Sequence, residues 1–188
     1  MATLRLFIAV DTPADIKSRI VGLQQQLKQA NARVSWEPPG KLHTTIKFLG
    51  DTEEQMVTGI VGTLEEIGSH APPLSVRYRG LGCFPTTHDP KVVWVGIDDV
   101  GENLARLQRQ IEDGLEQHGF EPERRPFRPH LTLGRVRERT QIESLLTKME
   151  TVTFESTLAT LHEIILVKSV LKPAGSMYTI LKSIPLNG

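Results

Sequence analysis

A histidine followed two residues later by a threonine occurs twice in this chain, at places that match each other. The first copy is His43 with Thr45 and the second is His130 with Thr132, so the two histidines are 87 positions apart (130 − 43 = 87). Both copies lie where apolar and polar residues alternate, which is the pattern of a half-buried β-strand. A repeat of this length indicates a chain built from two similar units. Only folds that contain two such units remain possible, which is a strong limit.

The residues around each copy predict the same order of elements: strand, helix, His-x-Thr strand, helix and strand. The helix behind each copy is predicted to open with a capping box, from Thr52 or from Thr140, and these two threonines are 88 apart (140 − 52 = 88). Thr12 before Pro13 resembles the cap of an earlier helix. The expected strands are 4–10, 42–48, 74–81, 92–97, 130–135 and 152–158, and the expected helices fill four of the gaps between them.

Such a duplication predicts two lobes that face each other across a cleft, within a single domain of residues 1–188. The lobes would cover about 1–84 and 90–160. The apolar segments of the C-terminal part, 161–186, would pair as strands that complete the sheets. The two histidines would then meet from opposite walls of the cleft.

Composition limits the function classes that remain open. Lysine plus arginine equals aspartate plus glutamate, 22 against 22, so any contact with a nucleic acid must depend on local charge. Cys83 is the only cysteine, which excludes an intramolecular disulfide and predicts a reducing, cytoplasmic setting. The sequence shows neither a signal peptide nor the roughly 20 apolar residues of a membrane span, so no membrane partner is expected.

Two histidines that each have a threonine beside them suit the in-line opening of a phosphodiester. That reaction requires a base for the attacking oxygen and an acid for the leaving oxygen. Histidine can serve as either near neutral pH because its unperturbed pKa is about 6.5. Threonine hydroxyls can donate hydrogen bonds to the non-bridging oxygens of the phosphate.

Other uses of these residues are weaker explanations. Zinc usually requires three or four ligands, and no acidic or cysteine partner lies beside either motif, so no metal is expected. A serine hydrolase would need a nucleophile on a glycine-flanked turn, and G-x-S-x-G is absent. A single His-x-Thr would be an ordinary exposed strand face, but its repetition at matched positions favours a site.

Together these motifs resemble those of the 2H phosphoesterases. The resemblance is carried by the two His-x-Thr strands, by the opening Arg-Leu-Phe-Ile-Ala-Val, by the block 42–50 and by the block 127–135, and it spans nearly the whole chain. Within that superfamily the chain is most similar to the bacterial and archaeal RNA 2′,3′-cyclic phosphodiesterases, or 2′-5′ RNA ligase family. The resemblance implies an α+β, bilobal fold of two pseudo-symmetric antiparallel β-sheets, with helices on the outer faces and a central cleft.

The resemblance also implies the roles of the motif residues. His43 and His130 would be the catalytic pair, with His130 as the base and His43 as the acid, and Thr45 and Thr132 would bind the phosphate. Arg135 would contact phosphate as well. Strict alternation turns Arg135 away from His130, so this role requires a β-bulge or a strand end between them.

Further substrate contacts are predicted at positions near the motifs. Lys47 would share the face of His43 and Thr45, with Phe48 on the opposite face. Phe7 would either stack on a nucleobase or fill an interface. Arg128, with Arg124 and Arg125, would give a neutral protein a basic rim, or would simply be solvated. Ser169 falls in a segment similar to family positions near the substrate.

The resemblance implies metal-independent hydrolysis of RNA 2′,3′-cyclic phosphate ends to 2′-phosphates, without a cofactor, and also 2′,5′ RNA ligase activity. The expected partners are RNA ends bearing the cyclic phosphate, tRNA fragments among them, and the protein is expected to be a monomer. Two alternatives remain open at this point. One is a phosphodiesterase for 2′,5′-oligoadenylate or a small cyclic nucleotide, and the other is a non-catalytic module that binds RNA ends.

Overall fold

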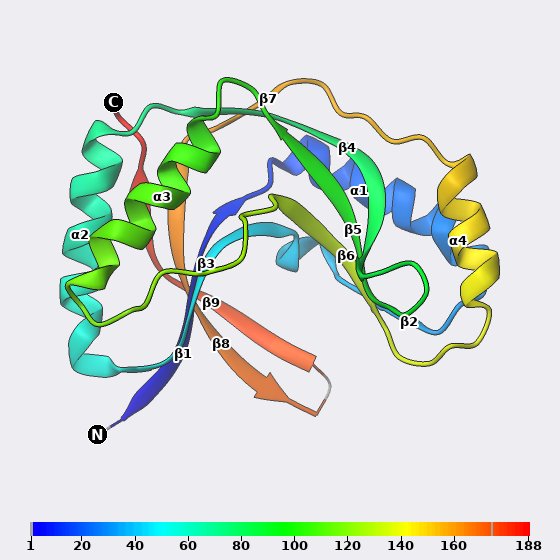
Figure 1. Ribbon diagram of the computed structural model, residues 1–188, viewed down its shortest axis with the longest axis horizontal. Coiled ribbons are helices and arrows are strands. Elements are labelled where there is room, and N and C mark those ends of the chain that lie inside the picture. The colour runs from blue at the N-terminus through cyan, green and yellow to red at the C-terminus, as the bar shows by residue number, and fades with distance from the viewer. Residues whose placement is uncertain (1, 174) are drawn as a thin grey trace.

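Two antiparallel sheets lie side by side at the centre of the molecule (Figure 1). The computed structural model describes residues 2–173 and 175–188. Strand order in the four-stranded sheet is β3-β1-β8-β9, with β3 at His43–Glu53, β1 at Thr3–Asp11, β8 at Glu163–Lys172 and β9 at Gly175–Pro185. Strand order in the five-stranded sheet is β2-β6-β5-β4-β7, with β2 at Val34–Trp36, β6 at His130–Val136, β5 at Pro90–Asp99, β4 at Leu74–Pro85 and β7 at Ala159–Leu161.

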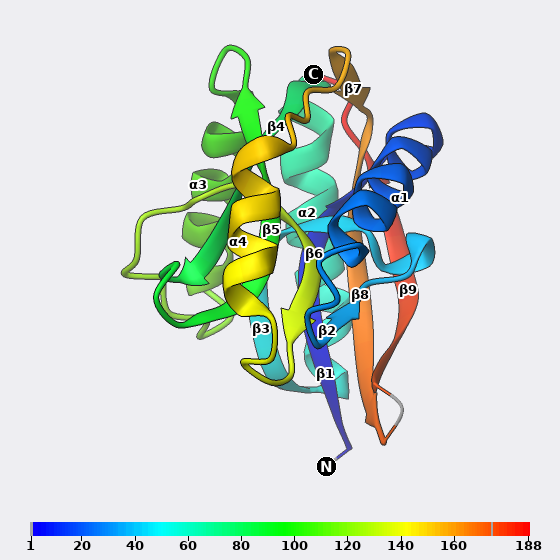
Figure 2. The same cartoon turned by 90° about the vertical axis from the view of Figure 1, so that its right-hand side faces the viewer.

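Helices cover the outer sides of both sheets. On one side α2, Val57–His70, packs against α3, Asn103–Glu116, and on the other α1, Ala14–Lys28, packs against α4, Ile142–Thr151 (Figures 1 and 2). Each helix presents apolar residues at helical spacing to the interior, such as Ile16, Ile20 and Leu23 of α1. Removing such side chains from water is worth about 1.5 to 3 kcal/mol each. The predicted α+β fold of two antiparallel sheets with outer helices is confirmed.

The two halves of the chain exchange elements between the sheets. From the first half, β2 pairs with β6 and β4 pairs with β5, so both join the sheet that carries His130. The helix pairs likewise combine one helix from each half. Strands β8 and β9 both extend the four-stranded sheet, whereas the C-terminal segments were expected to complete both sheets. The boundaries 1–84 and 90–160 therefore stay a prediction about how the sequence repeats.

Strand β1 separates the main core from the face that carries the first His-x-Thr motif. Leu6, Ile8 and Val10 point into the large apolar core, and the intervening Phe7 and Ala9 join a small second cluster with residues of β8. This is the alternation expected of a strand buried on both faces.

The predicted threonine caps are wrong. Helix α1 follows Pro13, and α4 follows Gln141, which has a left-handed conformation. Thr52 lies inside β3, and α2 follows Met56 instead. None of these three helices has a side-chain cap. Backbone pairing extends β3 past Thr52, whose hydroxyl donates to the carbonyl oxygen of Gly50 instead. The helix that does have carboxylate caps is α3, where Asp99 accepts from the N–H groups of Leu104 and Ala105 at 3.0 and 2.8 Å.

The expected strand at 152–158 is also displaced. Glu155 forms one isolated bridge with Arg79, and regular pairing begins only at β7. The other expected strands are present.

Candidate active site

The first motif lies on the face of β3 that is shared with the second apolar cluster. His43 is paired with Asp11 and Thr45 with Ala9, and residues paired across antiparallel strands point to the same side. His43 and Thr45 are both half-buried on this face. The predicted arrangement of an imidazole with a hydroxyl beside it is therefore present in β3.

A β-bulge follows this motif at once and reverses the direction of the next side chains. Ala9 pairs with Thr45 and Ile8 with Lys47, so Ile46 has no partner of its own on β1. Lys47 consequently points to the core side with Ile8, and its ammonium forms an ion pair with Glu112 of α3. The prediction that Lys47 shares the face of His43 is wrong for this reason, and its side chain is only 5% exposed.

The same bulge brings Phe48 to the face of the motif. Phe48 is paired with Phe7, is 74% exposed, and has its ring centroid 6.1 Å from that of Phe7. Strict alternation predicted that Phe48 lies on the face opposite His43, and this prediction is also wrong. Phe7 itself is 3% exposed, so it has little free ring surface for a nucleobase, and Phe48 is the accessible aromatic residue here.

A second bulge gives β6 the geometry that Arg135 requires. Thr132 pairs with Trp94 and Gly134 with Val93, which leaves Leu133 without a partner of its own on β5. Leu131 and Leu133 are both fully buried, while Arg135 is exposed. The bulge thus turns Arg135 to the side of His130 and Thr132, as its predicted role demands.

Gly134 is required at this bulge by the close approach of β2. A Cβ atom on Gly134 would lie 2.6 Å from Val34 Cγ1 and 3.1 Å from the carbonyl oxygen of Ser35. Glu37, the residue after β2, forms an ion pair with Arg135: its carboxylate oxygen lies 3.5 Å from Arg135 Nε.

Each histidine rests against a phenylalanine. The rings of His43 and Phe7 are stacked with centroids 4.9 Å apart and an interplanar angle of 25°. The ring of His130 meets Phe84 edge-on, also at 4.9 Å. Tyr178 supports His43 at 5.4 Å, and Trp94 lies 6.3 Å from His130. These contacts limit the rotation of both imidazoles.

Burial keeps both imidazoles neutral in the free protein. It lowers the pKa of His43 from 6.5 to about 4, against opposing contributions from Asp11 and from a backbone hydrogen bond with Lys41. Burial likewise lowers the pKa of His130, against a hydrogen bond between its Nδ1 and the carbonyl oxygen of Arg128 at 2.7 Å. The charge of Arg135 lowers both pKa values.

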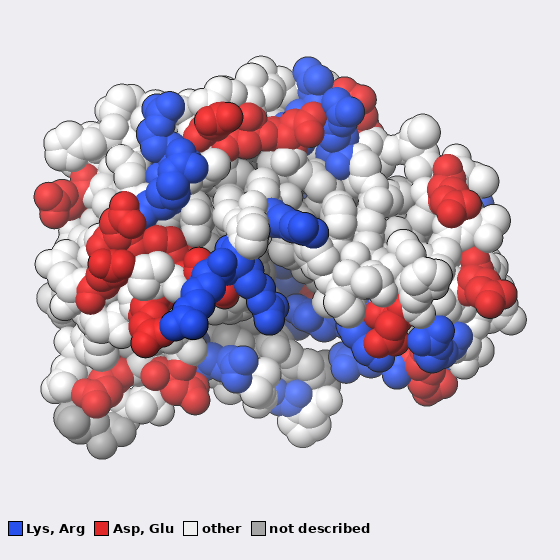
Figure 3. All heavy atoms as spheres, in the orientation of Figure 1, with Lys and Arg blue, Asp and Glu red and all other residues white. Residues whose placement is uncertain are grey.

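The two motifs are thereby linked through Arg135. Strands β3 and β6 belong to different sheets and contact each other, and one guanidinium acts on the imidazole of each. Figure 3 shows a hollow near the centre of one face of the molecule, with lysine and arginine side chains along its rim. A bound anion near Arg135 would counter its charge at both histidines.

The remaining predicted residues lie near these motifs in different ways. Ser169 of β8 is half-buried, is paired with Tyr178 and lies two residues from Val167 of the second cluster, so it belongs to the face of His43. Arg128 is exposed and touches the site through its carbonyl, which accepts from His130. Phe48 and Phe84 were not among the predicted site residues, and only the bulge and the sheet pairing reveal their positions.

Within residues 2–173 and 175–188, no three His, Cys, Asp or Glu side chains cluster closely enough to hold a metal ion. No helix in these segments combines the length and the apolar character needed to cross a membrane.

Comparison with known proteins gives one consistent family. The model of the 2′-5′ RNA ligase superfamily matches residues 7–172. A protein of Methanothermobacter thermautotrophicus named RNA 2′,3′-cyclic phosphodiesterase is 34% identical over 94% of this chain and 95% of its own length. A protein of the same name from Methanocaldococcus jannaschii is 31% identical over 95% and 99%. Among solved structures, TT0787 of Thermus thermophilus matches with a TM-score of 0.84 and 26% identity over 98% of this chain and 99% of its own. The chain belongs to the 2′-5′ RNA ligase superfamily.

Proposed function

We propose that this protein is a two-histidine phosphodiesterase that opens 2′,3′-cyclic phosphates at the 3′ ends of RNA and leaves a 2′-phosphate. The observation that carries the proposal is the pair of His-x-Thr strands in contact, with the charge of Arg135 acting on both imidazoles. The names of the relatives in Methanothermobacter and Methanocaldococcus support the substrate class.

His130 acts as the general base in this proposal. Its Nδ1 bonds to the Arg128 carbonyl, which can only accept, so Nδ1 carries a proton and Nε2 is left free in the neutral ring. Nε2 takes a proton from water as the water oxygen forms its bond to phosphorus. The neutral state favoured by burial suits this role.

His43 acts as the general acid and protonates the 3′ oxygen as its bond to phosphorus breaks. Asp11 supports this assignment, because its carboxylate raises the pKa of His43, whereas no carboxylate contributes to the pKa of His130. Asp11 also forms an ion pair with Lys17 at 2.7 Å, and the charge of Lys17 lowers the pKa of His43. A pKa of about 4 is too low for an acid at neutral pH, so the proposal requires the bound phosphate to raise it.

The phosphate is held by the hydroxyls of Thr45 and Thr132 and by the guanidinium of Arg135. These donors stabilise the charge on the non-bridging oxygens while water attacks. If the 5′-hydroxyl of a second RNA took the place of water, the same steps would form a 2′,5′ linkage, which is the ligase activity. RNA ends in the cytoplasm, those of tRNA fragments included, are the proposed substrates of a monomer.

The proposal is tested with an oligonucleotide that ends in a 2′,3′-cyclic phosphate, incubated with purified protein in the presence and absence of EDTA. We expect a 2′-phosphate product at equal rates in both. Loss of turnover with EDTA, or a 3′-phosphate product, would exclude the proposed chemistry. Parallel assays with 2′,5′-oligoadenylate and with mononucleotide cyclic phosphates distinguish the alternative substrates, and binding of the 2′-phosphate end without turnover would indicate a non-catalytic module.

The pH dependence should differ between the free and the bound enzyme. The profile of kcat/KM reports the free enzyme, in which the acid His43 has a pKa of about 4. As the pH is raised, kcat/KM should therefore begin to fall at a pH lower than 6.5, the pKa of an unperturbed histidine. Phosphate raises that pKa, so kcat should fall only at higher pH. NMR titration of the His43 ring with and without adenosine 2′-phosphate measures the shift directly, and equal midpoints would contradict it.

Replacing Arg135 with glutamine should both slow the reaction and change the histidines. Loss of a phosphate donor is expected to lower kcat/KM about 10²- to 10³-fold. Because the positive charge lowers the pKa of His43 and of His130, its removal should raise both in the free protein. NMR pH titration of Arg135→Gln checks this, with Arg33→Gln, an exposed arginine paired with Glu138, as the control.

A further inference from the structure

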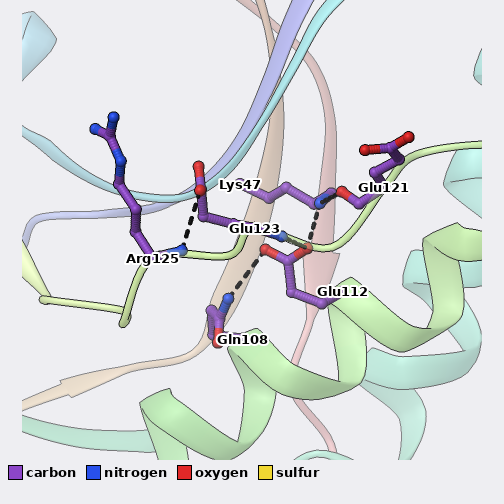
Figure 4. Close-up of polar contacts among 6 residues, drawn as sticks. All are labelled: Lys47, Gln108, Glu112, Glu121, Glu123 and Arg125. Atoms are coloured by element: carbon purple, nitrogen blue, oxygen red, sulfur yellow. Dashed lines mark hydrogen bonds and ion pairs between the residues drawn. The ribbon is translucent and has the colours of Figure 1, made fainter.

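The loop between α3 and β6 carries three arginines that are exposed to solvent. These are Arg124, Arg125 and Arg128, and none of them forms an ion pair with a carboxylate in the described part of the chain. Two glutamates lie in the same loop, but the backbone of Glu121 and of Glu123 makes the contacts to Lys47 and Glu112, and the Glu123 carboxylate accepts from the N–H of Arg125, not from its guanidinium (Figure 4). The arginine side chains are therefore available to a ligand.

Buried side chains hold this loop in place. Lys47 Nζ donates to the carbonyl oxygen of Glu121 at 2.9 Å, and Glu112 accepts from the N–H of Glu123 at 3.1 Å (Figure 4). Lys47 and Glu112 are 5% and 8% exposed and are paired with each other, and Gln108 donates to the second carboxylate oxygen of Glu112 at 3.0 Å. Burying an ion pair to this degree costs desolvation energy, which is offset only when further hydrogen bonds satisfy both charged groups. The hydrogen bonds to the loop backbone are therefore part of what stabilises this pair.

The anchored loop connects the two motifs of the site. Its first anchor, Lys47, lies on β3 four residues after His43, and its far end is the Arg128 carbonyl that accepts from His130. The chain as a whole carries no net charge, so free arginines at this point give the site local positive charge. Arginine binds phosphate groups well because its donors form a planar fork.

We propose that residues 121–128 bind the phosphate backbone of an RNA strand whose 3′ end occupies the site, and that the Lys47–Glu112 pair positions this loop. This inference rests on the proposed function for the identity of the bound end. It extends that function to the nucleotides upstream of the cyclic phosphate and makes the protein selective for polynucleotides over mononucleotides.

Binding measurements test the loop independently of turnover. The probes are a fluorescent single-stranded RNA of about ten nucleotides with a 3′-terminal 2′-phosphate, within the usual range of site sizes, and adenosine 2′-phosphate. Each phosphate contact on a single strand adds about 0.7 to the slope of log Kd against log salt. The variant Arg124→Gln/Arg125→Gln should therefore lower the slope by about 1.4 and weaken RNA binding about 25-fold at 0.1 M salt.

The matched control is Arg106→Gln/Arg109→Gln, which removes the same charge from the exposed side of α3 and should leave both the affinity and the slope unchanged. The inference is overturned if the two double variants bind RNA alike, or if wild-type protein binds the RNA no more tightly than adenosine 2′-phosphate. Because neither outcome depends on hydrolysis, failure of the proposed function is seen separately in the turnover assay.

The positioning role is tested at Glu123, outside the buried pair. Glu123→Pro removes the N–H that donates to Glu112, whereas Glu123→Ala keeps that N–H. Both variants remove the carboxylate and the hydrogen bond that it accepts from the N–H of Arg125. We expect Glu123→Pro to weaken RNA binding about tenfold. Glu123→Ala should weaken it much less, since it keeps the anchor to Glu112 and removes a negative charge beside the arginines. Equal affinities for the two variants would show that the anchor does not position the loop.

Discussion

Substituting alanine for His43 or for His130 is expected to lower kcat by about 10²- to 10⁴-fold, because each imidazole moves a proton in the proposed step. The two roles belong to one reaction, so the double variant should be far less impaired than the product of the two single effects. Rates are measured with an oligonucleotide 2′,3′-cyclic phosphate under single-turnover conditions. His88→Ala, at an exposed loop histidine that belongs to neither motif, serves as the control and should keep full activity.

The binding of the 2′-phosphate product separates this result from misfolding. Thr45, Thr132 and Arg135 remain in both alanine variants, so product affinity should change much less than kcat. A variant that loses kcat and product binding together would indicate that the imidazole supports the site structurally. Turnover that survives either substitution would contradict the two-histidine mechanism.

The largest loss of stability is expected from Glu112→Ala. It leaves the ammonium of Lys47 buried in the protein without its carboxylate, and it also removes the acceptor for Glu123. Breaking one partner out of a buried pair usually costs about 3 to 5 kcal/mol, whereas replacing both with apolar residues is often neutral. Urea unfolding should therefore show a marked loss for Glu112→Ala and a small change for Lys47→Met/Glu112→Leu.

A surface pair provides the comparison for this measurement. Lys182 and Glu65 lie 2.7 Å apart but are 43% and 50% exposed, so Glu65→Ala should cost less than about 1 kcal/mol. If Glu112→Ala were as mild as Glu65→Ala, the buried pair would not contribute to the stability of the fold.

The sequence predicts the strands that carry the candidate site better than it predicts the residues around them. The spacing of the two histidines predicts two matching strands, and strict alternation reveals that Arg135 requires a bulge, which β6 contains. The bulge at Ile46 has no such sign, because no glycine or proline marks it and it depends on how β3 pairs with β1. Its consequence, the burial of Lys47, needs a partner in Glu112 that is 65 residues away.

Helix starts and the distribution of strands were harder to predict for a similar reason. A threonine followed three residues later by an acidic or amide residue satisfies the local rule for a cap. In the structure β3 continues through Thr52, which pairs with Leu4 of β1, so strand pairing takes the place of the predicted helix start. The exchange of β2 and β4 into the other sheet is set by contacts between distant segments. Local patterns carry no information about such contacts.

The exchange of strands and helices between the halves also determines how the walls of the site can move. A hinge needs two bodies joined by a few residues, but here a cut after Pro85 would separate β4 from β5 and α2 from α3. His43 and His130 are therefore held by one interlocked body, and the proposed proton transfers would not require substrate binding to close two domains first. We expect the adaptable parts of this protein to be its loops, so a ligand should change its amide-exchange rates there and leave the paired strands as they were.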